Sequence, residues 1–96
     1  PFYVYQGDEI AKKINFLKKD LSAKIPQPLL IRYAVKANPN QSILRLIARA
    51  GCGVEVVSGG ELWRSLQAGL NPEEIIFSGV GKTLEELHYA IDQKIE

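Results

Sequence analysis

Lys36 is the residue whose type and position most directly suggest chemistry, because it ends a mostly apolar run over residues 29–36. Such a run predicts a buried parallel strand, and ligands in α/β proteins bind at the carboxyl ends of such strands. An amine held among apolar side chains is a better nucleophile towards a carbonyl group. A lysine at a strand end can equally extend its amine into solvent. Position alone leaves the catalytic and the structural interpretation open.

The alternation of side chains along this strand indicates where Lys36 points. Lys36 shares one face with Ala34 and Arg32, and the apolar residues at positions 31, 33 and 35 share the other. In a closed barrel the apolar face would pack against helices. We therefore expect Lys36 to point into the mouth of such a barrel.

Glu55 has the equivalent place in a second predicted strand, where it lies between Val54 and Val56. A carboxylate in a buried run is rarely left without a partner. A neighbouring amine such as that of Lys36, or a cationic ligand, would provide one. An ion pair inside the sheet and a contact to a cofactor are both consistent with this position.

Two glycine-containing segments resemble phosphate-binding loops. Residues 58–61 read Ser-Gly-Gly-Glu, but the Ser-x-x-Glu spacing of a helix capping box already accounts for Ser58 and Glu61. Residues 79–83 read Gly-Val-Gly-Lys-Thr, but a P-loop needs glycine at the position that Ile76 occupies. We therefore expect no nucleotide hydrolase, and we expect Thr83 to cap a helix.

Cys52 and His88 are the remaining side chains with reactive groups. Cys52 follows a helix end, away from any strand mouth, which favours a buried structural thiol over a nucleophile. His88 shares a helical face with Leu84 and Ile91, and no second histidine joins it, which favours a half-buried histidine over a metal ligand. Trp63 is expected to pack between a helix and the sheet.

The elements that must position these residues alternate along the chain. Strands are predicted at residues 2–5, 29–36, 53–57 and 75–77. Helices are predicted after Asp8, over residues 42–50, from Ser58 to Gly69, and from Thr83 onwards. The first helix carries lysines at positions 12, 13, 18 and 19, which we interpret as a solvated outer face.

Strands that alternate with helices predict a parallel sheet with right-handed crossovers, as found in open doubly wound sheets and in closed barrels. We predict an α/β fold that comprises the first three βα units of a (β/α)8 barrel. Residues 1–28 would form an N-terminal strand and helix, and residues 29–96 the first part of the barrel. A complete barrel needs about 250 residues, so we expect this 96-residue chain, which contains no methionine, to be part of a longer protein.

Composition narrows the functional classes. The chain is 46% hydrophobic and 24% charged, which is typical of a soluble globular protein. Its formal net charge of +1 argues against a nucleic-acid partner. No apolar run approaches the roughly 20 residues of a membrane span, and no leader peptide is expected. A single cysteine fits a reducing, cytoplasmic compartment and excludes a multi-cysteine zinc site.

Three runs of residues resemble one enzyme family. They are Tyr-Ala-Val-Lys-Ala-Asn at 33–38, Gly-Cys-Gly-Val-Glu-Val-Val-Ser-Gly-Gly-Glu-Leu at 51–62, and Ile-Ile-Phe-Ser-Gly-Val-Gly-Lys-Thr at 75–83. With the opening residues 1–5, they are similar to the pyridoxal-phosphate-dependent decarboxylases of the alanine-racemase-like barrel type. The resemblance covers essentially the whole chain. Residues 57–61 and 78–83 are similar in particular to the diaminopimelate decarboxylases, because ornithine and arginine decarboxylases usually carry other residues there.

The resemblance implies a function for three residues. In this family the lysine that matches Lys36 forms the internal aldimine with pyridoxal phosphate, and the residues that match Ala34 and Glu55 line the cofactor pocket. The implied reaction converts meso-diaminopimelate to L-lysine and CO2, the last step of lysine biosynthesis. The family commonly has Asp where this chain has Glu55, so the reach of this carboxylate differs by one methylene.

The resemblance also implies what this chain lacks. The family's cofactor-stacking histidine, glycine-rich phosphate loop, pyridine-facing acidic residue and substrate-binding β-domain all come later in the sequence. We therefore expect residues 1–96 alone neither to decarboxylate a substrate nor to bind the cofactor tightly. The full-length protein is expected to be a homodimer that acts on a small amino acid, with neither nucleic acid nor membrane as a partner.

Three alternative functions remain open at this level. A decarboxylase of another basic or polyamine-related amino acid could use the same barrel. A non-catalytic homologue could act as a binding protein, although it would not need the amine of Lys36. A pyridoxal phosphate carrier would lack the β-domain, which the predicted strand at residues 2–5 suggests is present.

Overall fold

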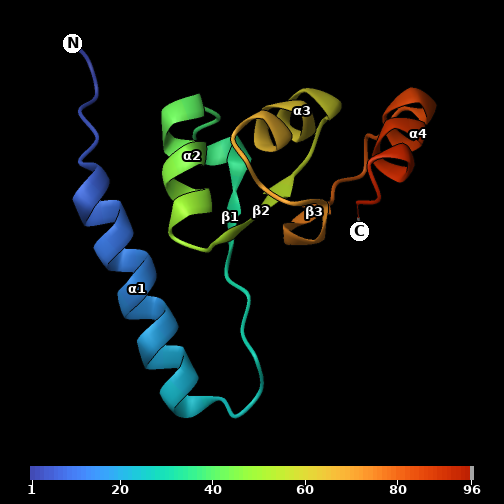
Figure 1. Ribbon diagram of the computed structural model, residues 1–96. Helices are drawn as coiled ribbons and strands as arrows, with labels where there is room; N and C mark the ends of the chain where they lie inside the picture. Colours follow the sequence, from blue (N-terminus) through green and yellow to red (C-terminus); the bar gives the residue numbers. More distant parts are fainter. Residues whose placement is uncertain (96) are drawn as a thin grey trace.

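The computed structural model describes residues 1–95, in which four α-helices accompany a parallel sheet of three strands (Figure 1). In chain order the elements are α1 (Gly7–Lys24), β1 (Arg32–Ala34), α2 (Gln41–Arg49), β2 (Gly53–Val56), α3 (Gly59–Gln67), β3 (Ile75–Phe77) and α4 (Leu84–Asp92). A 3-10 turn follows β1 at Val35–Ala37, and another precedes β3 at Pro72–Glu74. The predicted α/β class is confirmed.

The strands lie in the order β1-β2-β3, and their register decides which side chains share a face. Ala34 pairs with Glu55, and Glu55 pairs with Ile76. Because residues in register on parallel strands point to the same side, these three side chains form a row across one face of the sheet. Glu55 and Ile76 are only half-buried, whereas their strand neighbours are buried.

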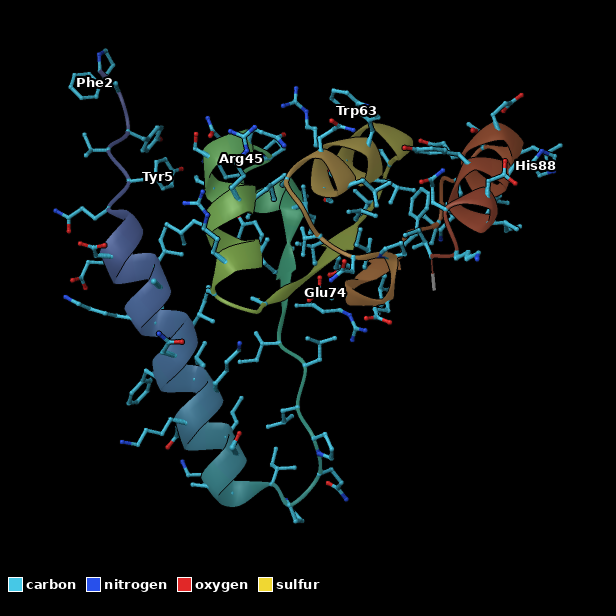
Figure 2. The ribbon with its side chains drawn as sticks, viewed as in Figure 1. Phe2, Tyr5, Arg45, Trp63, Glu74 and His88 are labelled. Atoms are coloured by element: carbon cyan, nitrogen blue, oxygen red, sulfur yellow. The ribbon has the colours of Figure 1, made fainter. Side chains whose placement is uncertain are left out.

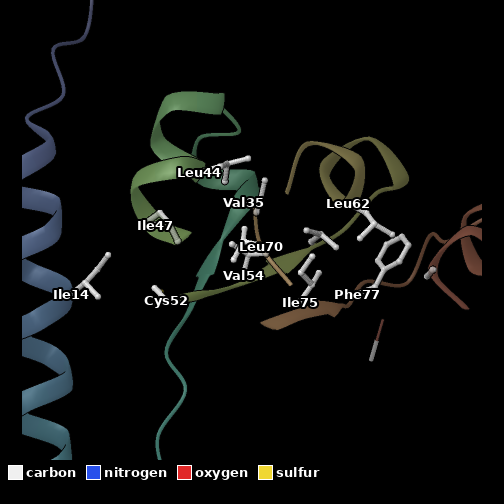
Figure 3. Packing of buried hydrophobic residues seen from close by; sticks show 12 residues of the cluster. Ile14, Val35, Leu44, Ile47, Cys52, Val54, Leu62, Leu70, Ile75 and Phe77 are labelled. Carbon is white, nitrogen blue, oxygen red and sulfur yellow. The ribbon is translucent and has the colours of Figure 1, made fainter. Parts of the chain in front are cut away.

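The opposite face of the sheet carries the core. Val35, Val54 and Ile75 are fully buried and cluster with side chains of α2 and α3 (Figure 3). The helices contribute Leu44, Ile47 and Leu62. Burying an aliphatic side chain of this size contributes about 1.5–3 kcal/mol, so this layer holds the strands in place. The face with Glu55 has no equivalent cover within residues 1–95.

Side-chain caps explain where the helices begin. The Asn40 side chain accepts a hydrogen bond from the Ser42 N–H at 2.9 Å at the start of α2. Thr83 and Glu86 form the predicted capping box of α4, with N···O distances of 3.1 and 3.0 Å. Such caps satisfy N–H groups that have no partner within the helix. The predicted helix start at Thr83 is therefore confirmed.

The box predicted for α3 is only half confirmed. The Ser58 hydroxyl accepts a hydrogen bond from the Glu61 N–H at 3.2 Å, as expected. The Glu61 carboxylate, however, accepts from the N–H of Val57 at 2.9 Å rather than from that of Ser58. Both side chains still serve the turn between β2 and α3.

The segment before α1 departs from the prediction. Residues 1–6 form no strand, and the side chains of Phe2 and Tyr3 are 87% and 91% exposed. Figure 1 shows this segment leading away from the sheet. A strand needs a neighbour for its backbone groups, and none lies beside these residues in the described chain. The predicted strand at Phe2–Tyr5 is therefore wrong for residues 1–95.

One lysine of α1 also departs from the prediction. Lys12, Lys13 and Lys19 are exposed, as expected of a solvated face. Lys18 is half-buried instead, and its Nζ donates hydrogen bonds to the carbonyls of Ala50 and Gly51, both at 2.7 Å. These carbonyls lie at the C-terminus of α2, where a cation is favourable. Lys18 thereby fastens α1 to α2.

Trp63, His88 and the large apolar side chains of α4 are more exposed than the sequence predicts. Trp63 is 55% exposed on α3 and does not pack between helix and sheet (Figure 2). His88 is exposed rather than half-buried. On α4 the small Ala90 is buried while Leu84 and Ile91 are 66% and 69% exposed, because α4 packs on α3 and not across the sheet. None of the described helices has the length and apolarity of a membrane span.

Candidate active site at the carboxyl edge of the sheet

Lys36 lies immediately beyond β1, in the 3-10 turn Val35–Ala37. Val35 points into the core and is fully buried, so the next residue, Lys36, is turned away from the core and exposed. Within residues 1–95 its amine donates no hydrogen bond and forms no ion pair. The expected position at the carboxyl end of β1 is confirmed; of the two environments left open for the amine, among apolar side chains or in solvent, the described residues show the exposed one.

The apolar run before Lys36 forms a shorter strand than the sequence predicts. β1 covers only Arg32–Ala34, and Leu29 and Leu30 are 37% and 41% exposed. The partner strand β2 begins at Gly53, which pairs with Arg32. Ile31 still accepts a hydrogen bond from the Gly53 N–H at 2.9 Å, but the residues before Ile31 have no strand of the described chain with which to pair.

Glu55 lies in the middle of the uncovered row, next to Ala34 and Ile76. Its Oε1 accepts a hydrogen bond from the Ser78 hydroxyl at 2.5 Å. Among the described residues Glu55 makes no ion pair with Lys36. Of the two partners expected for this carboxylate, the neighbouring amine is thus not the one observed.

Ser78 is a site residue that the sequence reasoning missed. It lies two positions after Ile76, and its N–H donates to the carbonyl of Val56 at 2.9 Å, which extends the ladder beyond β3. Side chains two positions apart point to the same face. Because Glu55 pairs with Ile76, this alternation places Ser78 next to the Glu55 carboxylate; the strand pairing is the signal that would have identified it.

The segment Ser58-Gly59-Gly60 is not a vacant phosphate cradle. The Gly59 N–H donates to the Glu86 carboxylate at 2.8 Å, and the Val57 N–H donates to Glu61 at 2.9 Å. These groups are the donors that a phosphate at the start of a helix would need. The preferred interpretation of this segment as a helix start is confirmed.

In the segment Gly79–Thr83, the amine of Lys82 likewise has its contacts within the protein. The Lys82 Nζ donates to the carbonyl of Gly79 at 2.7 Å and lies 5.3 Å from the centre of the Phe77 ring. Gly79 adopts a φ of 99°, which favours glycine and turns the chain after β3. Ile76 lies within β3, where a P-loop would need its first glycine.

Cys52 is buried at the start of β2, with 1% of its surface exposed. Its Sγ donates to the carbonyl of Ile31 at 3.1 Å. Burial raises the pKa of the Cys52 thiol, and the nearby charge of Lys18 opposes this only in part. The thiol therefore stays protonated near neutral pH, which agrees with the predicted structural role.

An apolar pocket of about 430 Å³ lies between α1, α2 and β1, and Lys36 is not among the residues that line it. Its lining includes Ile10 and Ile14 of α1 together with Tyr33 of β1. Tyr33 uses its hydroxyl to donate to the carbonyl of Asn38 at 3.2 Å, and burial raises its pKa. The lining is mainly apolar, but it also includes the amine of Lys13 and the guanidinium of Arg32.

The side chains at the sheet edge fit a carbonyl-bearing cofactor and do not fit a metal ion. An exposed primary amine can bind a carbonyl carbon covalently, and Ala34 is small enough to leave space beside Glu55. The described residues contain no group of three His, Cys, Asp or Glu side chains that could hold a metal. Lys36, Ala34 and Glu55 are thus the candidate contacts within residues 1–95.

A parallel α/β sheet with a lysine amine exposed just beyond the carboxyl end of β1 is compatible with the class of α/β enzyme domains that bind a carbonyl ligand through lysine. The sequence matches, over residues 8–96, the family described as "Pyridoxal-dependent decarboxylase, pyridoxal binding domain". The chain belongs to this family.

Individual relatives are diaminopimelate decarboxylases. The chain is 45% identical over 92 residues to that of Zymomonas mobilis and 46% identical over 95 residues to that of Campylobacter jejuni. It covers 22% and 23% of these relatives, so it spans less than a quarter of their length. The crystal structure of diaminopimelate decarboxylase from Helicobacter pylori complexed with L-lysine matches 99% of this chain and 23% of that one, with 43% identity and a TM-score of 0.86.

Proposed function

We propose that the full-length protein decarboxylates meso-diaminopimelate to L-lysine and CO2, with pyridoxal phosphate attached to Lys36. The observation that carries the proposal is the exposed amine of Lys36 at the carboxyl edge of β1, beside the row that contains Glu55. The substrate is inferred from the similarity, over nearly the whole chain, to a decarboxylase crystallised with L-lysine, the product of this reaction.

The residues of this chain would contribute binding and orientation. The Lys36 amine would hold the carbonyl carbon of the cofactor, which fixes the reacting centre at the sheet edge. The Glu55 carboxylate would line the pocket beside the Lys36 nitrogen, and Ala34 would leave room for the bound group. The chemistry supplied by bound pyridoxal phosphate is withdrawal of the electrons that the departing CO2 leaves behind.

We further infer the context in which this chain acts. Residues 29–96 would supply the first three βα units of an eight-stranded barrel, and residues 1–28 the segment before it. The full-length protein would be a cytoplasmic homodimer. Residues 1–96 alone would be inactive, because Lys36 and Glu55 provide only part of a site for a phosphorylated cofactor.

The test uses the full-length protein with pyridoxal phosphate and meso-diaminopimelate, and measures the L-lysine formed. Wild-type protein should form lysine, and borohydride treatment followed by peptide mapping should add the mass of the reduced cofactor at Lys36. Lys36→Ala should lose both signals, and Lys36→Arg, which keeps the charge but not the amine, should lose them too. Lys19→Ala, at an exposed position of α1, serves as the control and should retain both.

Two results would contradict the proposal in different ways. Decarboxylation of ornithine or arginine in place of meso-diaminopimelate, with the mass gain still at Lys36, would refute the substrate and leave the site intact. Lysine formation that survives Lys36→Ala unchanged would refute the function of Lys36 itself.

A further inference from the structure

The hydrogen bond between Ser78 and Glu55 is the closest polar contact on the uncovered face of the sheet. Glu55 lies in β2 and Ser78 directly follows β3, and the Ser78 Oγ lies 2.5 Å from the Glu55 Oε1. The backbone of Ser78 is held as well, because its N–H donates to the Val56 carbonyl at 2.9 Å. The hydroxyl is therefore presented to the carboxylate from a fixed position.

This contact restricts a side chain that would otherwise be mobile. A glutamate has several rotatable bonds, and ordering such a side chain costs free energy that a partner must offset. A serine hydroxyl has one proton to donate, so the contact occupies one oxygen of the Glu55 carboxylate. Within residues 1–95 no hydrogen bond involves the second oxygen, Oε2.

We propose that Ser78 is a positioning residue for the site at Lys36: it holds the Glu55 carboxylate in one orientation, with Oε2 left for the Lys36 nitrogen that carries the cofactor. The inference rests on the proposed function, since it assumes that the cofactor is bound at Lys36. Ser78 acts through Glu55 and needs no contact with the cofactor itself.

The experiment compares Ser78→Ala and Ser78→Thr in the full-length protein loaded with pyridoxal phosphate. The readouts are kcat and KM, together with the pH titration of the absorbance of the bound cofactor. Ser78→Ala should lower kcat about tenfold and shift the titration to lower pH, because the carboxylate no longer holds its position beside the charged nitrogen. Ser78→Thr keeps the hydroxyl and should restore both to near wild type.

Two further variants separate positioning from a loss of stability. Ser78→Cys is close to isosteric and a weak donor, so it should reproduce the effects of Ser78→Ala even if the alanine variant folds poorly. In a Glu55→Gln background Ser78→Ala should change the titration no further, because the group on which it acts has lost its charge. Ser22→Ala, at an exposed position of α1, is the control and should match wild type.

The outcomes distinguish this inference from the proposed function. If wild-type protein takes up cofactor at Lys36 and Ser78→Ala or Ser78→Cys leaves kcat and the titration unchanged, the positioning function of Ser78 is wrong and the proposed function stands. Equal effects of Ser78→Ala with and without Glu55→Gln would also overturn it. If wild-type protein shows no cofactor at Lys36, both proposals fail, and this is evident before any Ser78 variant is compared.

Discussion

Glu86 connects the N-termini of two helices. Its Oε1 accepts a hydrogen bond from the Gly59 N–H of α3 at 2.8 Å, and its Oε2 accepts one from the Thr83 N–H before α4 at 3.0 Å. Both N–H groups lie where a helix presents partial positive charge and unsatisfied donors. One carboxylate thereby joins the loop after β2 to the loop after β3. The first loop follows the strand that carries Glu55, and the second begins with Ser78.

Substitution of Glu86 should loosen both helix starts. Glu86→Ala removes both acceptors, so we expect a lower midpoint of thermal unfolding in the full-length protein. Glu86→Gln can still accept from Gly59, but its NH2 group would face the Thr83 N–H, so its midpoint should fall between alanine and wild type. Glu85→Ala, at the exposed position before it, is the control. Equal midpoints for the two alanine variants would contradict the bridging function.

The same carboxylate predicts a pH dependence. The hydrogen bond from Gly59, and then that from Thr83, lower the pKa of Glu86 below its ordinary value. Because the folded-state pKa is the lower one, the stabilisation is present above the unfolded pKa of about 4.3 and is lost as pH falls through the folded value. The stability difference between wild type and Glu86→Gln should therefore shrink in acid, and a difference that grew there would contradict this assignment.

Lys18 should prove to be the most important lysine of α1 for stability. Its Nζ bonds to the carbonyls of Ala50 and Gly51 satisfy the C-terminus of α2. Lys18→Ala should lower the free energy of unfolding by roughly 1 kcal/mol, the size expected for hydrogen bonds from a cation at a helix end. Lys19→Ala should change it by less than about 0.5 kcal/mol, as is usual for exposed positions. Urea unfolding of the full-length variants measures both free energies. Equal losses of stability in Lys18→Ala and Lys19→Ala would show that the contacts of Lys18 with α2 contribute nothing.

Cys52 should be protected from thiol reagents in the folded protein. Burial raises the pKa of its thiol, and the reactive species is the thiolate. Labelling followed by peptide mapping should be at least about tenfold slower in the native protein than in denaturant. Since the folded-state pKa is the higher one, the thiol's contribution to stability is full below the unfolded pKa of about 8.5 and declines at alkaline pH. Cys52→Ala should lack that alkaline decline, and rapid native labelling would contradict the burial.

The sequence predicts best the elements whose signals are local. The helices α2 and α3 and the strands β2 and β3 lie within one or two residues of their expected bounds, because caps and glycines mark their ends. Lys36 lies at the expected carboxyl edge of the sheet because the apolar run that predicts β1 ends there and a loop follows it. Its contribution to catalysis stays a prediction, as do those of Ala34 and Glu55.

What the sequence does not predict depends on partners far away in the chain. Leu29 and Leu30 have the composition of a strand, but among the described residues no strand lies beside them. Lys18 has the spacing of a surface lysine, yet α2 ends within its reach. Ser78 acquires its contact with Glu55 only through the register of β2 and β3, which no local pattern specifies.

Gly53 should be the glycine at which a side chain is least tolerated. It begins β2, and a Cβ built there would overlap the carbonyl oxygen of Glu74, which belongs to the backbone and cannot move aside as a side chain could. Gly53→Ala should therefore lower the free energy of unfolding by about 1–3 kcal/mol, as overpacking does elsewhere. At Gly81 a Cβ would meet nothing within 4 Å and φ lies outside the left-handed region, so Gly81→Ala should be neutral or slightly stabilising. Similar stabilities for the two variants in urea unfolding would show that β2 and the turn at Glu74 move apart at little cost.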